Sequence, residues 1–151
     1  MKLETIREHD ERCEANKQKM KRGPWTDEPN RLNWKAHGLD CMIVRNTAGL
    51  HLCGYVGVTK EHPDFKKEYD DVCVDVHGGL TYGELCGGAI CHFTEDGDDE
   101  TYWLGFDCAH LGDYSPTSRY LPDPFEKYRE IEFVKGETER LAEQLAQRSS
   151  Q

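Results

Sequence analysis

The centre of the chain consists of short apolar segments separated by turn residues, and this pattern narrows the choice of fold more than any other feature. Residues 39–45 and 51–58 are apolar runs on either side of a turn-like sequence, NTAG, at 46–49. Two such runs joined by a short turn are typical of a β-hairpin. Residues 101–107 (TYWLGFD) carry the aromatic residues that favour strands. We therefore expect a mainly antiparallel sheet.

Other central segments have weaker patterns. Valines alternate with polar residues over 72–77, a period of two that predicts a strand, and a second extended piece is expected at 80–85. Residues 89–93 are a candidate short strand. The acidic run EDGDDE at 95–100 is expected to be a solvated turn, as most charge runs are. Residues 24–37 contain two tryptophans and no clear period, which indicates an irregular loop anchored to the core.

The two ends of the chain favour helices. Residues 131, 134, 138, 141 and 145 are Ile, Val, Thr, Leu and Leu, and their spacing places them on one helix face. We predict a helix over about 124–147, with Asp123 as N-cap and Pro124 at its first position; a strand over 130–135 is the alternative. Residues 1–22 are expected to be a charged helix or a partly ordered arm.

The fold class is therefore α+β, with a single domain over 23–151 whose sheet packs against the C-terminal helix.

Length and charge exclude several function classes. The chain has 151 residues, which fits one domain, and a formal net charge of -10. Such an acidic chain without a basic cluster is poorly suited to bind nucleic acid or an anionic membrane surface. No apolar run approaches the roughly 18 residues that a membrane span needs, and the first residues lack the apolar core of a secretion signal. We expect a cytoplasmic protein.

The seven cysteines and seven histidines raise the questions of disulfides and metal. An odd number of cysteines without a secretion signal predicts reduced thiols, most of them buried in the apolar runs. The chain has no C-x-x-C and no H-E-x-x-H sequence, so we predict no cofactor. A three-ligand zinc site made by His77, Cys108 and His110 remains an alternative, since imidazole and thiolate are zinc ligands.

Two polar segments are the candidates for function. In VDVHGGLTY (74–82), Gly78 and Gly79 permit positive φ and a close approach to a ligand. The neighbouring polar side chains can donate and accept hydrogen bonds. The predicted ligand-binding residues of this segment are His77, Gly78, Gly79, Thr81 and Tyr82. The alternative is a hairpin or bulge that happens to contain a histidine.

The second segment is WLGFDCAHLGD (103–113), where Asp107, His110 and Asp113 follow a strand. A carboxylate beside His110 could orient the imidazole and raise its basicity, so these three residues join the predicted ligand-binding set. Alternatively, both carboxylates cap a turn by binding their own backbone. A nucleophilic role for Cys108 is disfavoured, because acidic neighbours oppose thiolate formation.

In combination, CGYVGV, HP, YDDV, VDVHGGLTY and WLGFDCAHLGD resemble a family of small uncharacterised proteins of bacteriophages and bacteria. The resemblance covers roughly residues 50–116 and the C-terminal helix pattern. It implies a small accessory protein, encoded by a phage and acting in the host cytoplasm. It supplies no catalytic residues.

Three functions remain open from the sequence. The first is a non-catalytic protein that binds and sequesters a small polar ligand, with a nucleotide-derived host defence signal as one candidate. The second is a hydrolase that uses His77 and His110 with Asp107 or Asp113, with or without zinc. The third is an acidic inhibitor that covers a basic surface of a host protein. A homo-oligomer is compatible with each of them.

Overall fold

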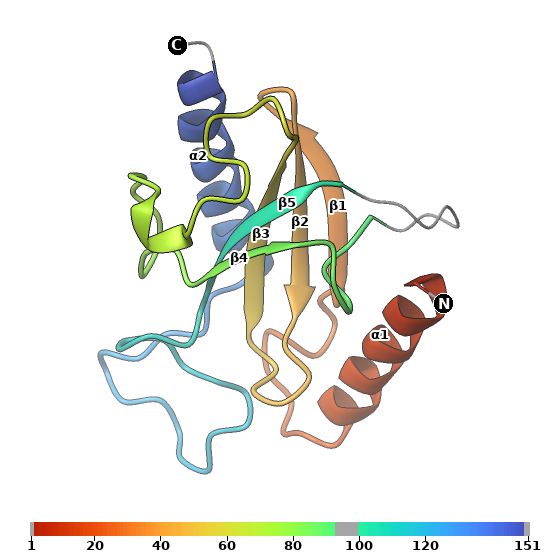
Figure 1. The fold of residues 1–151 in the computed structure, drawn as a ribbon. Coiled ribbons are helices and arrows are strands. Elements are labelled where there is room, and N and C mark those ends of the chain that lie inside the picture. The colour runs from red at the N-terminus through yellow and green to blue at the C-terminus, as the bar shows by residue number, and fades with distance from the viewer. Residues whose placement is uncertain (1, 93–99, 150–151) are drawn as a thin grey trace.

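Five strands form one antiparallel sheet with the order β1-β2-β3-β5-β4 (Figure 1). The computed structural model describes residues 2–92 and 100–149. The strands are β1 (Arg31–Ala36), β2 (Leu39–Arg45), β3 (Leu52–Val58), β4 (Tyr82–Leu85) and β5 (Tyr102–Asp107). The strands predicted at 39–45, 51–58 and 101–107 are thus confirmed as β2, β3 and β5, and β2 and β3 pair as the predicted hairpin.

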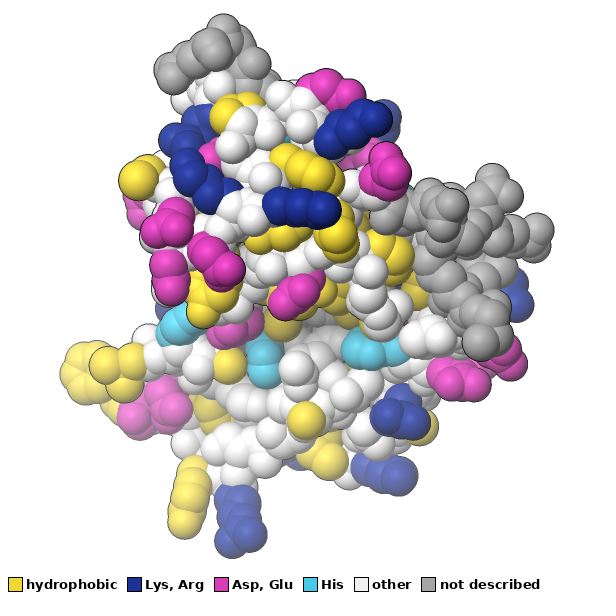
Figure 2. All heavy atoms as spheres, in the orientation of Figure 1, with side chains coloured by type: hydrophobic (Ala, Val, Ile, Leu, Met, Phe, Trp, Pro, Cys, Tyr) yellow, Lys and Arg dark blue, Asp and Glu magenta, His cyan; other side chains and the backbone are white. Residues whose placement is uncertain are grey.

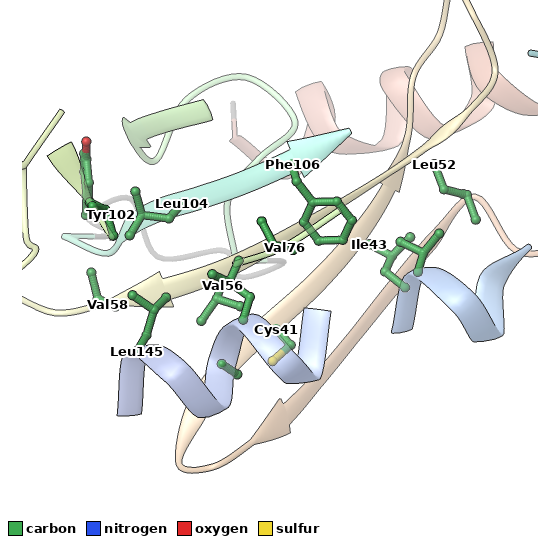
Figure 3. Close-up of a cluster of buried hydrophobic side chains, with 14 of the residues drawn as sticks. Cys41, Ile43, Leu52, Val56, Val58, Val76, Tyr102, Leu104, Phe106 and Leu145 are labelled. Atoms are coloured by element: carbon green, nitrogen blue, oxygen red, sulfur yellow. The ribbon is translucent and has the colours of Figure 1, made fainter. Parts of the chain in front are cut away.

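One face of the sheet packs against α2 (Ile131–Ser149), and the main core lies between them (Figure 3). Ile43, Val56 and Phe106 project from β2, β3 and β5 into this core, where they meet Val134 and Leu145 of the helix stripe. Side chains of a strand alternate between the two faces. The neighbouring residues therefore form a smaller cluster on the opposite face: Met42, Val44, Cys53, Tyr55 and Trp103. The predicted α+β fold, with an antiparallel sheet against a C-terminal helix, is confirmed.

The N-terminal segment forms α1 (Lys2–Gln18), which lies beside the end of β2 (Figure 1). The Cys13 thiol donates to the backbone carbonyl of Arg45 at 3.1 Å, and the Asn16 amide donates to that of Thr47 at 3.0 Å. Ile6 is fully buried. A short 3-10 helix, η1 (Tyr69–Asp71), precedes the first polar segment. None of the helices within 2–92 and 100–149 has the length and apolar character to cross a membrane.

The predicted start of the C-terminal helix at 124 is wrong. Asp123 does cap a turn, because its Oδ1 accepts the backbone N–H groups of Phe125 and Glu126 at 2.8 and 3.0 Å. The chain then leaves the turn in extended form, and the Lys127 N–H donates to the carbonyl of Gly112. This bond joins the segment to the loop after β5, so the helix begins only at residue 131.

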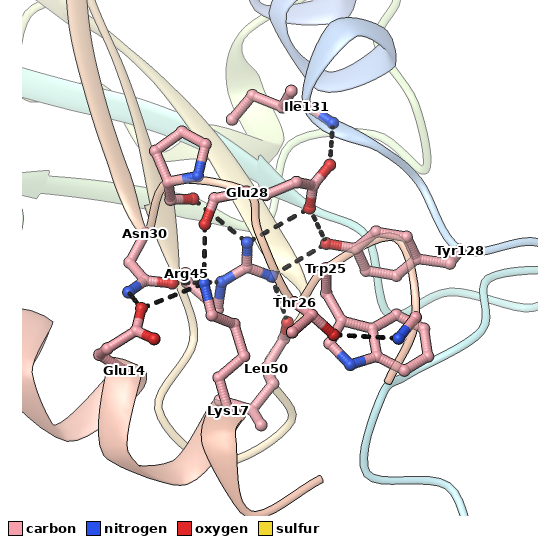
Figure 4. A network of polar contacts seen from close by, with 12 residues as sticks. Glu14, Lys17, Trp25, Thr26, Glu28, Asn30, Arg45, Leu50, Tyr128 and Ile131 are labelled. Atoms are coloured by element: carbon pink, nitrogen blue, oxygen red, sulfur yellow. Dashed lines mark hydrogen bonds and ion pairs between the residues drawn. The ribbon is translucent and has the colours of Figure 1, made fainter. Parts of the chain in front are cut away.

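The N-terminus of α2 is instead capped by a distant carboxylate, Glu28, as part of a buried network (Figure 4). Glu28 Oε2 accepts the Ile131 N–H at 2.8 Å, and its Oε1 accepts the Tyr128 hydroxyl and lies 3.3 Å from Arg45 Nη2. The fully buried Arg45 also donates to Asn30 Oδ1 at 2.8 Å and to Tyr128 Oη at 2.9 Å. A carboxylate at a helix N-terminus satisfies free N–H groups and complements the helix dipole.

The strand predicted at 72–77 is absent, because the backbone there bonds to helix side chains rather than to a neighbouring strand. Gln144 accepts the Asp75 N–H at 2.7 Å and donates to the Asp75 carbonyl at 2.7 Å. Glu137 accepts the His77 N–H at 2.8 Å. Val72 and Val76 are nevertheless buried in the main core. The alternation therefore reflects burial, and α2 supplies the backbone partners.

Three other predictions are wrong at least in part. Part of the expected loop at 24–37 forms the edge strand β1, whose residue Trp34 packs against the main core. No strand forms over 89–92, the described part of the strand expected at 89–93, where the chain makes a tight turn in which the backbones of Gly87 and Ile90 bond to each other. This turn sets Cys86 and Cys91 opposite each other with Cα atoms 4.8 Å apart, and they form a disulfide, contrary to the expected thiols. Residues 93–99, including most of the acidic run at 95–100, lie outside the described residues.

Candidate histidine and aspartate site

The two polar segments meet at one end of the sheet, where each forms a turn. The first turn is closed by a bond from the Gly79 N–H to the Val76 carbonyl at 2.8 Å. Gly78 and Gly79 have φ values of +70° and +80°, a region in which glycine is strongly preferred. A Cβ added at Gly78 would overlap the His110 ring of the second turn. The first turn therefore uses glycine for conformation and for close packing of His110.

Asp113 is the centre of the site. Its side chain is fully buried and its Oδ2 lies 2.9 Å from His77 Nε2. Arg129 Nε donates to Oδ1 at 2.8 Å, and the His110 backbone N–H donates to Oδ2 at 3.0 Å. Burial acts to raise the pKa of Asp113, but the hydrogen bonds from Arg129 and His77 outweigh it and the net shift is downward. A buried, ionised carboxylate thus holds both segments together.

His110 lies between two carboxylates. Its Nδ1 is 3.3 Å from Asp107 Oδ1 and 3.8 Å from Asp113 Oδ2. Among the described residues this buried nitrogen has no hydrogen-bond partner, although 28% of the side chain is exposed. Asp107 also accepts the Thr81 hydroxyl at 3.0 Å and the Ala109 N–H at 3.0 Å. Both carboxylates therefore cap turns, as the alternative interpretation expected, and both also border a histidine.

Three residues of this site were missed by the sequence analysis: Arg129, Phe133 and Glu137. Phe133 packs edge-on against the His77 ring with centroids 5.2 Å apart, and the Arg129 guanidinium lies 4.9 Å above the Phe133 ring. Glu137 holds the His77 backbone, as described above. The three are spaced by four residues, which is a helical spacing. That spacing is the signal in the sequence that could have pointed to them, but it is weaker than the apolar stripe of the helix.

Two residues named in the sequence analysis do not join the site. Tyr82 begins β4 and packs edge-on against Tyr55, with centroids 5.2 Å apart, in the cluster on the face away from α2. Cys108 lies in the main core, where burial and then the nearby Asp113 charge raise the pKa of its thiol. A buried thiol that resists ionisation is a poor metal ligand and nucleophile. Cys108 is therefore replaced by Asp113 in the group of possible metal ligands.

That group consists of His77, His110 and Asp113, whose donor atoms all lie within 4.8 Å of one another. Histidine side chains reach the surface across the middle of the face drawn in Figure 2. Next to the group is a hollow of about 490 Å³ lined by residues 127–133. Arg129 and Phe133 contribute to both the hollow and the cluster. None of the three donor residues lines this hollow, but the side chains of His77 and His110 are 16% and 28% exposed, so the site reaches solvent although its central carboxylate is buried.

Comparison with protein-family models, curated proteins and solved structures gives no match for this chain. The resemblance to phage and bacterial proteins accordingly stays a prediction, and the function must be argued from the site itself.

The packing of His110 on the first turn gives a testable prediction. Gly78→Ala should destabilise the protein by about 1–2 kcal/mol for the left-handed backbone and by about 1–3 kcal/mol more for overpacking against His110. Gly79→Ala is the matched control, since its φ is similar and its Cβ would meet no atom within 4 Å. Urea unfolding of both variants measures the difference. Equal losses in the two variants would show that His110 does not pack closely on Gly78.

Proposed function

We propose that the protein binds a small polar ligand at the cluster formed by His77, Thr81, Asp107, His110 and Asp113. The supporting observation is His110, whose ring is reached by solvent while its buried Nδ1 lacks a hydrogen-bond partner among the described residues. Buried polar atoms are nearly always paired in folded proteins, and exceptions often mark functional sites. Solvent does not reach Nδ1 itself, so a ligand group that bonds to this atom requires a small movement of the ring or of its neighbours.

The adjacent turns add groups that suit a polar ligand. Thr81 offers a hydroxyl beside Asp107, and the neighbouring Gly79 leaves open space where a side chain would stand. The hollow next to Arg129 and Phe133 offers a guanidinium and an aromatic ring. In the phage setting that the resemblance implies, nucleotide-derived host defence signals are the first ligands to test.

Calorimetry with a panel of nucleotides and cyclic nucleotide signals tests the proposal, together with native mass spectrometry of protein purified from cells. We expect one bound molecule per chain and at least about a tenfold loss of affinity in His110→Asn, which corresponds to about 1.4 kcal/mol. Tyr82→Phe is the control and should bind normally, because Tyr82 faces the other cluster. Absence of any bound molecule, or equal binding by the His110 variant, would contradict the proposal.

A second candidate, a hydrolase, is favoured by one observation. A buried carboxylate bonded to an imidazole is the arrangement by which acid/base sites orient a histidine and stabilise its protonated form, and Asp113 bonds His77 in this way. Incubation of the same panel with the protein separates the two functions. Product formation that His77→Gln abolishes would identify an enzyme, whereas recovery of intact ligand would identify a sequestering protein.

A further inference from the structure

We infer that His77, His110 and Asp113 bind a divalent transition-metal ion of the zinc class, and that this ion takes part in ligand capture. The role of the ion in ligand capture rests on the proposed function, but the metal site itself does not. The donor set is two imidazoles and one carboxylate, with His77 Nε2 2.9 Å and His110 Nδ1 3.8 Å from Asp113 Oδ2. Two histidines and a carboxylate that leave further positions open are a recurring set for zinc and for iron.

The charge around the group favours a cation. Asp107, Asp113 and Glu137 lie around the two histidines. Within the described ranges, the cations paired with these carboxylates are Arg129, bonded to Asp113, and Arg140, bonded to Glu137, so three negative charges face two positive ones. Neutral imidazoles therefore leave an excess of negative charge, which would repel the phosphate groups of a nucleotide. A divalent ion would reverse this balance and offer an open coordination position to an anionic group.

The surroundings also resemble the outer shell of metal sites, in which neighbouring groups orient the ligands. Glu137 fixes the His77 backbone, Arg129 fixes one oxygen of Asp113, and Asp107 borders His110. Phe133 holds the His77 ring by an edge-on contact. Coordination would replace the His77–Asp113 hydrogen bond, and the proton of the neutral His77 ring would move to Nδ1 so that Nε2 could face the ion.

Titration of the protein with Zn²⁺ by calorimetry, without thiol reductant, tests the inference. The exposed thiol of Cys73 is a competing site, so all variants carry Cys73→Ser. We expect one ion per chain and at least about a 100-fold weaker affinity in His110→Asn. His92→Asn is the matched control, because His92 lies 2.9 Å from Asp40 in a histidine–carboxylate pair that belongs to no three-donor group among the described residues.

Unchanged affinity in His110→Asn, an equal loss in His92→Asn, or no zinc binding at all would overturn the inference. If circular dichroism shows that His110→Asn does not fold, the unmutated protein is titrated with Co²⁺ in place of Zn²⁺. A visible d–d spectrum with shifts of both His77 and His110 ring signals is then expected, and shifts elsewhere would overturn it. If the protein binds zinc but no molecule of the ligand panel, the proposed function alone is refuted. If it binds a ligand but no zinc, this inference alone is refuted.

Discussion

Arg45→Met should destabilise the protein by about 3–5 kcal/mol, the usual loss when one partner of a buried ion pair is removed. Arg45 is fully buried, and its guanidinium bonds to Asn30, Tyr128 and the carbonyl of Leu50 (Figure 4). Without it, the largely buried carboxylate of Glu28 would lose its cation while still capping α2. Urea unfolding followed by circular dichroism measures the loss.

A matched control uses an exposed ion pair. Lys35 lies 3.8 Å from Asp40 and both side chains are reached by solvent, so Lys35→Met should change stability by less than about 1 kcal/mol. Similar losses of stability in Lys35→Met and Arg45→Met would mean that the Arg45 network does not hold together the loop before β1, strand β2 and helix α2.

Asp113→Asn should lower the free energy of unfolding by about 3 kcal/mol at neutral pH, because it removes the charge that binds Arg129 and His77 at the centre of the site. The cost should depend on pH in a defined direction. The pKa of Asp113 is lowered in the folded protein, where hydrogen bonds outweigh the opposing effect of burial. Its charge therefore stabilises the fold fully above the unfolded aspartate pKa of about 3.9 and less as pH falls through the folded value.

The measurement is the difference in unfolding free energy between the unmutated protein and Asp113→Asn from pH 7 to pH 3. We expect the difference to decrease as pH falls below about pH 4, where Asp113 becomes protonated. Asp75→Asn serves as control, because the exposed Asp75–Arg140 pair should contribute less than about 1 kcal/mol. A difference that keeps growing below about pH 4 would contradict the placement of a charged Asp113 between Arg129 and His77.

The parts of the fold that could be predicted are those whose burial leaves a periodic signal. The apolar runs of β2 and β3 and the stripe of α2 are such cases. The segment at 72–77 shows the limit of this signal, since its valines are buried while its backbone bonds to Gln144 and Glu137. Local sequence does not reveal which part of the chain will supply backbone partners. The start of α2 was misplaced for the same reason, because its cap, Glu28, is distant in sequence.

The candidate site was predictable where its residues lie in short polar segments after apolar runs. His77, Asp107, His110 and Asp113 were expected together, and they lie together. The contribution of the C-terminal segment was not expected, because Phe133 and Glu137 lie on a mixed polar and apolar face of α2, and Arg129 lies in the extended segment just before it. Tyr82 lies apart from this cluster because alternation along β4 sends its ring to the opposite face, and that face cannot be assigned until the sheet register is known.

The central claim, that the two histidines and Asp113 form the binding site, is tested most directly by NMR of the histidine ring nitrogens in the unmutated protein. Long-range ¹H–¹⁵N spectra are recorded before and after addition of Zn²⁺, and then of the nucleotide panel. We expect His77 and His110 to change tautomer or to shift, while His37 and His92 keep their signals. Binding detected by calorimetry without any change at His77 or His110 would contradict it.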